Sequence, residues 1–173
     1  MTTWQQDYEA LLARVTRPGL IEPARAATMS GLELLQGIAG GTVPCPPINA
    51  TLDFYLLEVE KGRAVFQGRP GMKHYNPMRT VHGGFHATLL DSAMACAIHS
   101  LLAAGQAYTT LEFKIHLVRP LTEKTGPVRA EGKIVASERR TATAEGRLAD
   151  EQGRLYSHGT TTCMIFDLEG AHA

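Results

Sequence analysis

The sequence predicts an α+β fold in which one curved antiparallel sheet wraps around a single long helix. Two strand-like segments precede an apolar helical stretch, about four more follow it, and short turns separate most of them. Short turns join antiparallel neighbours, and a sheet with one apolar face needs a cover. Only the stretch 84–104 is long and apolar enough to provide that cover.

The bulk composition is that of an ordinary globular domain, with 173 residues of which 44% are hydrophobic and 20% charged. Basic and acidic residues balance at seventeen each, so no nucleic-acid surface is indicated. The first residues lack the pattern of a signal peptide, and Cys45, Cys96 and Cys163 lie far apart, as expected of reduced thiols. We therefore expect a cytoplasmic protein that binds neither nucleic acid nor membranes.

Residues 1–48 are expected to form a helical extension to the main fold. Apolar residues recur at helical spacing between positions 4 and 15, ahead of Pro18. A second helix is predicted in "SGLELLQGIAGG", where Ser30 and Glu33 have capping-box spacing and two glycines can end the helix.

The main domain, residues 49–173, is predicted to begin with two strands in "ATLDFYLLEVEKGRAVFQGRP", joined by a turn at 60–62. The long helix follows and is expected to close at Gly105. Three further strand patterns come after "TTLEFKIHLVRP", in "GPVRAEGKIVASE", "TATAEGRLAD" and "RLYSHGTTTCMIF".

The segment "TTLEFKIHLVRP" alternates cleanly between apolar and polar side chains. One face carries Leu111, Phe113, Ile115 and Leu117. A small sheet of this kind has exposed edges and commonly pairs with a second copy. At least a homodimer is therefore expected.

Asp91 is the one acidic, Lys or Arg residue between positions 82 and 111. Burying a carboxylate is costly unless it is paired, hydrogen-bonded or neutralised. The small neighbours Ala87, Thr88 and Ala95 share its helical face and leave room for a ligand or a water. Asp91 thus either bonds a neighbouring loop or has a chemical role.

The Gly83-Gly84 pair lies at the predicted start of this helix. Backbone N–H groups there lack intrahelical acceptors and lie at the positive end of the helix dipole. Such groups can hold an oxyanion that develops on a carbonyl. The pair either forms a tight turn alone or supplies an oxyanion site about two turns from Asp91.

Together, "VHGGFHATLLDSAMACA", the upstream Asn76 and "TTLEFKIHLVRPL" resemble hotdog-fold thioesterases of the phenylacetic-acid-degradation (PaaI-like) group. The resemblance covers about residues 49–166. It implies a hotdog fold and an acyl-CoA thioesterase that releases the free acid and coenzyme A. It further implies a homodimer or a tetramer of two dimers, with no metal and no cofactor, since coenzyme A is part of the substrate.

The resemblance also implies roles for individual positions. Asp91 matches the acid that acts as general base or nucleophile, and Gly83 matches the glycine whose N–H polarises the thioester carbonyl. Asn76 matches a polar side chain near the thioester or the attacking water. Thr110 matches a hydroxyl that in part of the family reaches the water from the partner subunit, and His82 supports the loop.

The chain departs from some branches of the family, which carry Glu where this chain has Asp91 and a hydroxyl where it has Ala95. Positioning of the water therefore falls to Thr110 or Asn76. In relatives the region of Arg139 and Arg140 lies near the nucleotide end of coenzyme A, and arginine suits phosphate. The alternative for this arginine pair is a solvated turn.

Other residues and functions carry less support. Ser92 lacks a GxSxG elbow, and His99 is expected to be structural. Phe85, Met94 and Tyr108 are candidates for the wall of an acyl pocket. The sequence lacks the His-plus-acid helix signature that hydratases carry. The remaining alternative is a non-catalytic acyl-CoA-binding or sensing module that uses the same groove.

Overall fold

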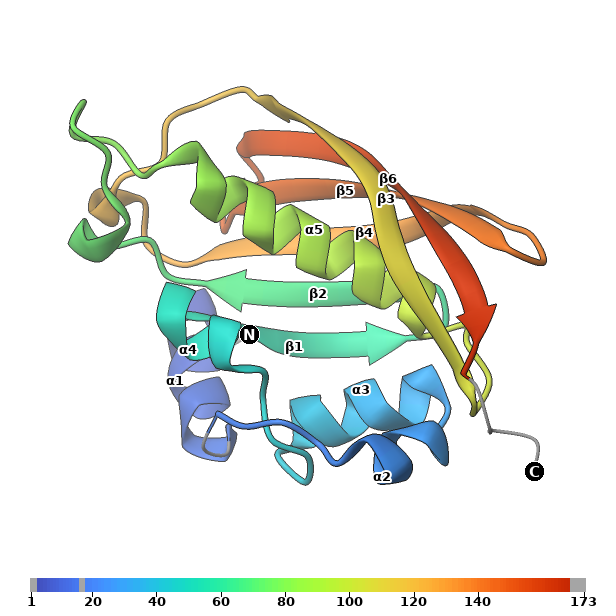
Figure 1. Ribbon diagram of the computed structural model, residues 1–173. Helices are drawn as coiled ribbons and strands as arrows, with labels where there is room; N and C mark the ends of the chain where they lie inside the picture. Colours follow the sequence, from blue (N-terminus) through green and yellow to red (C-terminus); the bar gives the residue numbers. More distant parts are fainter. Residues whose placement is uncertain (1–2, 16–17, 169–173) are drawn as a thin grey trace.

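The computed structural model describes residues 3–15 and 18–168, and it confirms the predicted fold (Figure 1). Six antiparallel strands form one sheet in the order β1-β2-β4-β5-β6-β3, curved around helix α5. The strands are β1 (Phe54–Glu60), β2 (Arg63–Gly68), β3 (Gln106–Leu117), β4 (Val128–Ser137), β5 (Thr141–Asp150) and β6 (Leu155–Asp167). The helices are α1 (Trp4–Arg14), α2 (Pro23–Ala27), α3 (Gly31–Gly40), α4 (Pro47–Leu52) and α5 (Gly83–His99), with short 3₁₀ turns at Met72–His74 and Glu123–Thr125.

The core lies between α5 and the concave face of the sheet. Leu89, Leu90 and Ile98 of α5 are fully buried there. Gly132 lets β4 approach the helix closely, because a Cβ atom at this position would lie 2.3 Å from the carbonyl oxygen of Ala93. The helix is therefore fixed against the sheet, and one side of it is left for the N-terminal part of the chain.

Two predicted boundaries are wrong. The long helix ends at His99 and not at residue 104, since the Ser100 hydroxyl donates to the carbonyl of Ala97 and accepts the N–H of Gly62. Residues 47–52 form α4, so the first strand begins only at Phe54. The expected division between residues 48 and 49 falls inside α4, and the far ends of both ranges lie outside the described residues.

The capping box of the second predicted helix is present as expected. The Ser30 hydroxyl accepts the N–H of Glu33 at 3.3 Å, and the Glu33 carboxylate accepts the N–H of Ser30 at 2.8 Å. Gly41 ends α3 with a φ of 78°, the left-handed conformation that glycine adopts without strain.

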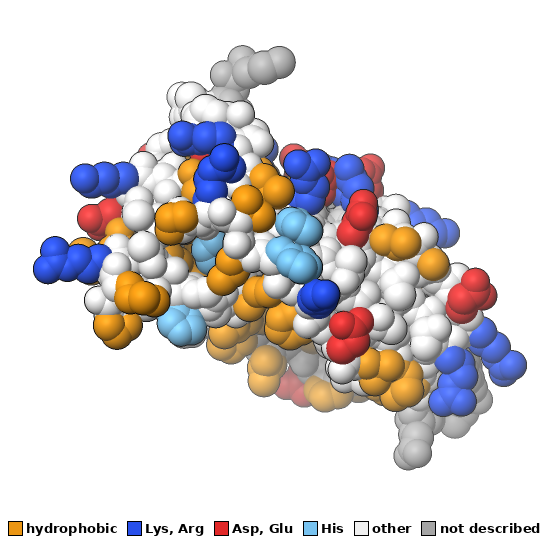
Figure 2. Space-filling model, turned by 90° about the horizontal axis from the view of Figure 1, so that it is seen from above, with side chains coloured by type: hydrophobic (Ala, Val, Ile, Leu, Met, Phe, Trp, Pro, Cys, Tyr) orange, Lys and Arg blue, Asp and Glu red, His pale blue; other side chains and the backbone are white. Residues whose placement is uncertain are grey.

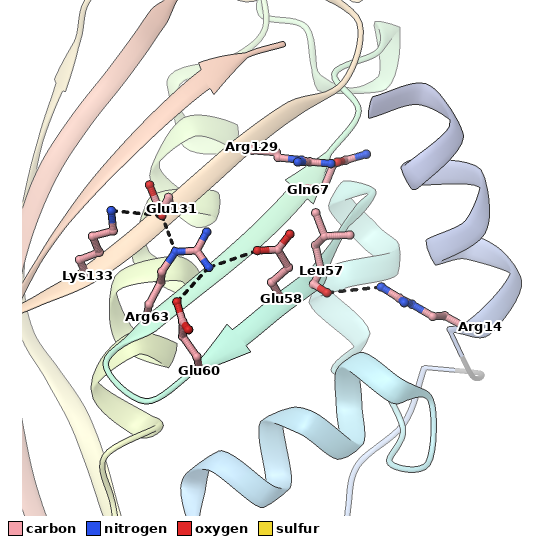
Figure 3. A network of polar contacts seen from close by, with 9 residues as sticks. All are labelled: Arg14, Leu57, Glu58, Glu60, Arg63, Gln67, Arg129, Glu131 and Lys133. Carbon is pink, nitrogen blue, oxygen red and sulfur yellow. Dashed lines mark hydrogen bonds and ion pairs between the residues drawn. The ribbon is translucent and has the colours of Figure 1, made fainter. Parts of the chain in front are cut away.

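The convex face of β1, β2 and β4 is polar (Figure 3). Arg63 forms ion pairs with Glu58 at 3.1 Å and with Glu131, which Lys133 also contacts at 3.3 Å. Partly exposed pairs of this kind contribute only about 0–1 kcal/mol each. Their effect is to keep this part of the convex face in water, beside the part that helix α1 covers.

Helix α1 is anchored to this convex face through Arg129. The guanidinium forms an ion pair with Asp7 at 2.6 Å and lies 4.3 Å from the centre of the Trp4 ring. Gln67 donates to the Trp4 carbonyl, and Tyr8 is buried. The extension therefore contacts both faces of the sheet, since α3 packs beside β1 and α5 on the other side.

Strand β3 forms an edge of the sheet and pairs with β6 alone among the described strands. Its apolar face is turned to solvent: Leu111 is 56% exposed, Phe113 43% and Leu117 55%. In Figure 2 hydrophobic side chains gather across the middle of the surface seen from above. The alternation predicted for this strand thus presents an uncovered apolar edge.

No helix among the described residues is long and apolar enough to cross a membrane.

Candidate active site

Asp91 faces a cavity of about 360 Å³. The cavity is lined from α5 by a stripe with a spacing of four residues, Asp91, Ala95 and His99, which one side of a helix presents together. Tyr108 and Thr110 of β3 complete the wall opposite this stripe. The helix and the edge strand therefore place a carboxylate at the side of a mainly apolar chamber.

The carboxylate of Asp91 has no cationic partner among the described residues. Burial raises its pKa above the ordinary 3.8, and a hydrogen bond from Thr110 partly offsets this increase. The Oδ1 atom is buried and has no hydrogen-bond partner in the described part of the chain. A buried, unsatisfied carboxylate oxygen is costly, so this arrangement is typical of a group kept for binding or chemistry.

Gly83 and His82 form the start of α5. The Nδ1 atom of His82, the N-cap residue, accepts the N–H of Gly84 at 2.8 Å. Gly83 is the first helical residue, and its N–H has no acceptor among the described residues. His82 thus orders the turn, as expected of a supporting residue, and leaves the Gly83 donor free for a ligand.

Asn76 holds the loop that leads to this turn. Its Oδ1 atom accepts the N–H of Met78 at 2.9 Å and that of Thr80 at 3.3 Å, while its amide donates to the Thr80 hydroxyl at 3.1 Å. Asn76 and Gly83 both line a second cavity of about 290 Å³, beside the end of β3 at Leu117. The side chain of Asn76 is therefore fixed close to the Gly83 donor.

The structure brings the predicted residues together as two separate groups. Asp91 lies with Thr110, and Gly83 lies with Asn76 and His82. Eight residues of helix separate Asp91 from Gly83, about 12 Å at 1.5 Å per residue. A carbonyl oxygen that accepts the Gly83 N–H at roughly 3 Å therefore lies outside direct hydrogen-bond reach of Asp91 in the same chain.

Arg139 and Arg140 lie in the turn between β4 and β5, and both are exposed. They line a third hollow of about 270 Å³ together with Gln106 and Asp167. This hollow is separate from the Asp91 cavity. Within the described residues, no group of three His, Cys, Asp or Glu side chains is arranged to hold a metal ion.

Several wall residues differ from the sequence-based expectation. Tyr108 lines the Asp91 cavity as predicted, but Phe85 and Met94 are 3% and 0% exposed and belong to the core. His99, expected to be structural, lies in the cavity wall with its ring 5.2 Å from that of Tyr108. More than half of the wall comes from residues 19–49, a contribution that no motif in the sequence predicts.

A six-stranded antiparallel sheet wrapped around one helix, with an acidic residue on that helix, defines a hotdog-fold protein of the thioesterase type. The family model described as "Thioesterase superfamily" matches residues 78–157. The chain belongs to this superfamily and to its PaaI-like group, as the resemblance implied.

Solved structures agree with this assignment. A protein from Thermus thermophilus is 33% identical, with a TM-score of 0.62 over 68% of this chain and 96% of that chain. A mutant of the phenylacetic acid degradation protein PaaI from the same organism is 32% identical, with a TM-score of 0.62 over 68% and 97%. Escherichia coli PaaI shares the fold, with 16% identity and a TM-score of 0.68 over 81% and 96%. A search of curated proteins found no match.

Proposed function

We propose that this protein is an acyl-CoA thioesterase, which hydrolyses a thioester to the free acid and coenzyme A. The observation that carries the proposal is the half-buried Asp91 carboxylate, whose buried Oδ1 atom has no hydrogen-bond partner among the described residues and which faces an apolar cavity. Membership in the thioesterase superfamily supports a thioester as the bond that is cleaved. The cavity supplies room for an acyl group beside the carboxylate.

In the proposed mechanism the thioester oxygen accepts the N–H of Gly83. Asp91 takes a proton from a water that attacks the carbonyl carbon, or its carboxylate attacks directly and water then hydrolyses the anhydride. In either case the carbon–sulfur bond breaks and coenzyme A leaves as the thiol after receiving a proton. General-base catalysis typically contributes ~10²–10⁴-fold, and one oxyanion donor contributes ~10²–10³-fold.

We propose that a second copy of the chain completes this site, since Gly83 and Asp91 of one chain are about 12 Å apart along the helix. A Cβ atom at Gly83 would lie 3.0 Å from the side chain of Leu117 near one end of β3, while Asp91 lies beside Thr110 nearer the other end. If β3 of one chain pairs antiparallel with β3 of a second chain, centred on the middle of the strand, Gly83 would approach the partner subunit's Asp91.

The same pairing would cover the exposed apolar face of β3, and it gives two composite sites in each homodimer. A tetramer would join two such dimers. Arg139 and Arg140 are proposed to contact the phosphates of coenzyme A, since they are exposed and lie at the end of the sheet where β3 begins. No metal or further cofactor takes part in the proposed mechanism.

Thiol release tests the proposal. The protein is mixed with a panel of acyl-CoA substrates and with the matching pantetheine thioesters, which lack the nucleotide, and free thiol is measured. We expect turnover of acyl-CoA and a higher KM for the pantetheine thioesters. Binding of acyl-CoA without thiol release would instead favour a sensing module, which would use the same apolar cavity.

Replacing Thr110 with valine is expected to change the pH profile. The Thr110 hydroxyl lowers the pKa of Asp91, so its removal should raise that pKa. Because Asp91 acts in its ionised form, the acid limb of kcat/KM should move to higher pH in Thr110→Val. Thr109→Val, at the exposed neighbouring position, is the control and should keep the wild-type limb. If the acid limb of kcat/KM fell at the same pH in wild type and in both variants, the effect of Thr110 on the pKa of Asp91 would be contradicted.

A further inference from the structure

The sheet does not cover all sides of α5, and the uncovered stripe contains Asp91, Ala95 and His99. On this side the helix is covered by residues 19–49, here called the wall segment, which includes α2, α3 and the first half of α4. The family fold itself is formed by β1 to β6 and α5, within residues 54–167. The wall segment is thus an addition placed directly over the cavity that Asp91 faces.

The wall segment is packed firmly against the fold. A Cβ atom at Gly31 would lie 1.8 Å from the carbonyl oxygen of His99, and the Gly31 N–H donates to Leu102 at 3.0 Å. Leu35 and Val43 are 3% and 2% exposed. Only glycine permits such close contact between α3 and the end of α5, so the segment has a defined position and a defined surface towards the cavity.

The cavity lining combines polar and apolar side chains. Asp91 and Thr110 provide polar groups on α5 and β3, while Leu34, Leu35 and Ile38 of α3 contribute apolar side chains from the wall segment. The lining is mainly apolar, and an apolar wall favours an apolar occupant. A thioester carbonyl at Asp91 would direct its acyl group towards these α3 side chains.

We propose that the wall segment forms the acyl-binding surface and limits the length of the acyl group. This inference rests on the proposed function, because it places the thioester carbonyl at Asp91. An engineered cavity of about 150 Å³ binds benzene, so the volume of 360 Å³ holds roughly fourteen carbon atoms by the same scale. Shorter chains leave space unfilled, and carbons beyond the cavity remain in water.

The experiment combines a binding arm with a turnover arm. Straight-chain carboxylic acids from butyrate to palmitate are titrated by calorimetry, and kcat/KM is measured for the corresponding acyl-CoA substrates. In wild type, affinity for the acids should rise by about fourfold per methylene group and stop rising near roughly fourteen carbons. Acids that bind without any dependence on chain length would overturn the inference.

Two variants change the wall in opposite directions. Leu34→Trp fills the cavity and should move the limit to shorter chains, whereas Ile38→Ala enlarges it and should move the limit to longer chains. Gln36→Ala, at an exposed position of the same helix, should behave as wild type. Circular dichroism verifies that each variant is folded. Wild-type chain-length profiles in both folded wall variants would overturn the inference.

The two arms separate the inference from the proposed function. Chain-length-dependent binding that shifts in the wall variants, without thiol release in any protein, would support the wall segment and reject the thioesterase. Thiol release whose chain-length preference is the same in all variants would support the thioesterase and reject the wall segment. Neither binding nor release would reject both.

Discussion

Asp91→Asn is expected to lose thioesterase turnover by ~10²–10⁴-fold, the contribution of a general base, while the protein becomes more stable. Burial raises the pKa of Asp91 in the folded chain above its ordinary value of 3.8. The stability linked to this group is therefore fully present below pH 3.8 and is lost as the pH rises through the folded-state pKa. At pH 7 the folded chain holds an ionised carboxylate that burial disfavours. Asparagine removes that charge without changing the shape of the side chain.

Thermal unfolding at two pH values measures this effect. At pH 7 we expect Asp91→Asn to melt at a higher temperature than wild type; in a chain of this size each kcal/mol of added stability raises the melting temperature by about 2–4 °C. The difference should disappear at acidic pH, where Asp91 itself is neutral. A variant with wild-type turnover would remove Asp91 from the mechanism. Equal melting temperatures at pH 7 would show that the carboxylate is satisfied in the folded protein.

Gly83→Pro is expected to lower kcat by ~10²–10³-fold, the usual effect of removing one oxyanion donor. Proline lacks the N–H but is favoured at the first position of a helix, which Gly83 occupies. The preceding His82 has φ −60° and ψ 140°, a conformation that proline accepts in its neighbour. The substitution should therefore delete the donor and keep α5. Gly83→Ala retains the N–H and is the matched control.

Mixing two inactive variants tests whether the site is shared between subunits. If Gly83 of one chain acts with the partner subunit's Asp91, a heterodimer of Gly83→Pro and Asp91→Asn contains one intact site. Random exchange of subunits should then restore about a quarter of wild-type activity, since half of the dimers are mixed and each has one working site of two. No recovery after verified exchange would place both groups in one chain and contradict the composite site.

The sequence predicted the strands and the capping of α3 well, because these depend on local patterns. The alternation from Leu111 to Leu117 identified β3, and Ser30 with Glu33 identified the start of α3. The end of the long helix was misplaced because Ser100 stops it through a contact with Gly62, which is distant in sequence. The residues that follow have a composition typical of a helix, but this tertiary contact ends the helix before them.

The candidate site was predictable only in part. The lone charge of Asp91 and the glycine pair pointed to the two groups for which we propose catalytic roles, and Thr110 does lie against Asp91. That Gly83 and Asp91 lie in different cavities follows from the helical rise and from packing, which no motif encodes. The wall segment was unpredictable for the same reason, because its position depends on the contact of Gly31 with His99.

The two borders of the sheet are treated differently, and this limits how many copies can join edge to edge. At β1 the helices of the extension lie alongside, and Arg14 donates to the outward carbonyl of Leu57. At β3 no such shield exists among the described residues. A sheet with two exposed edge strands could add further copies at both edges, as fibrils do. A sheet with one exposed edge strand can pair with only one other copy through that edge. We therefore expect any assembly larger than a pair to be joined through faces of the molecule and not through further strand edges.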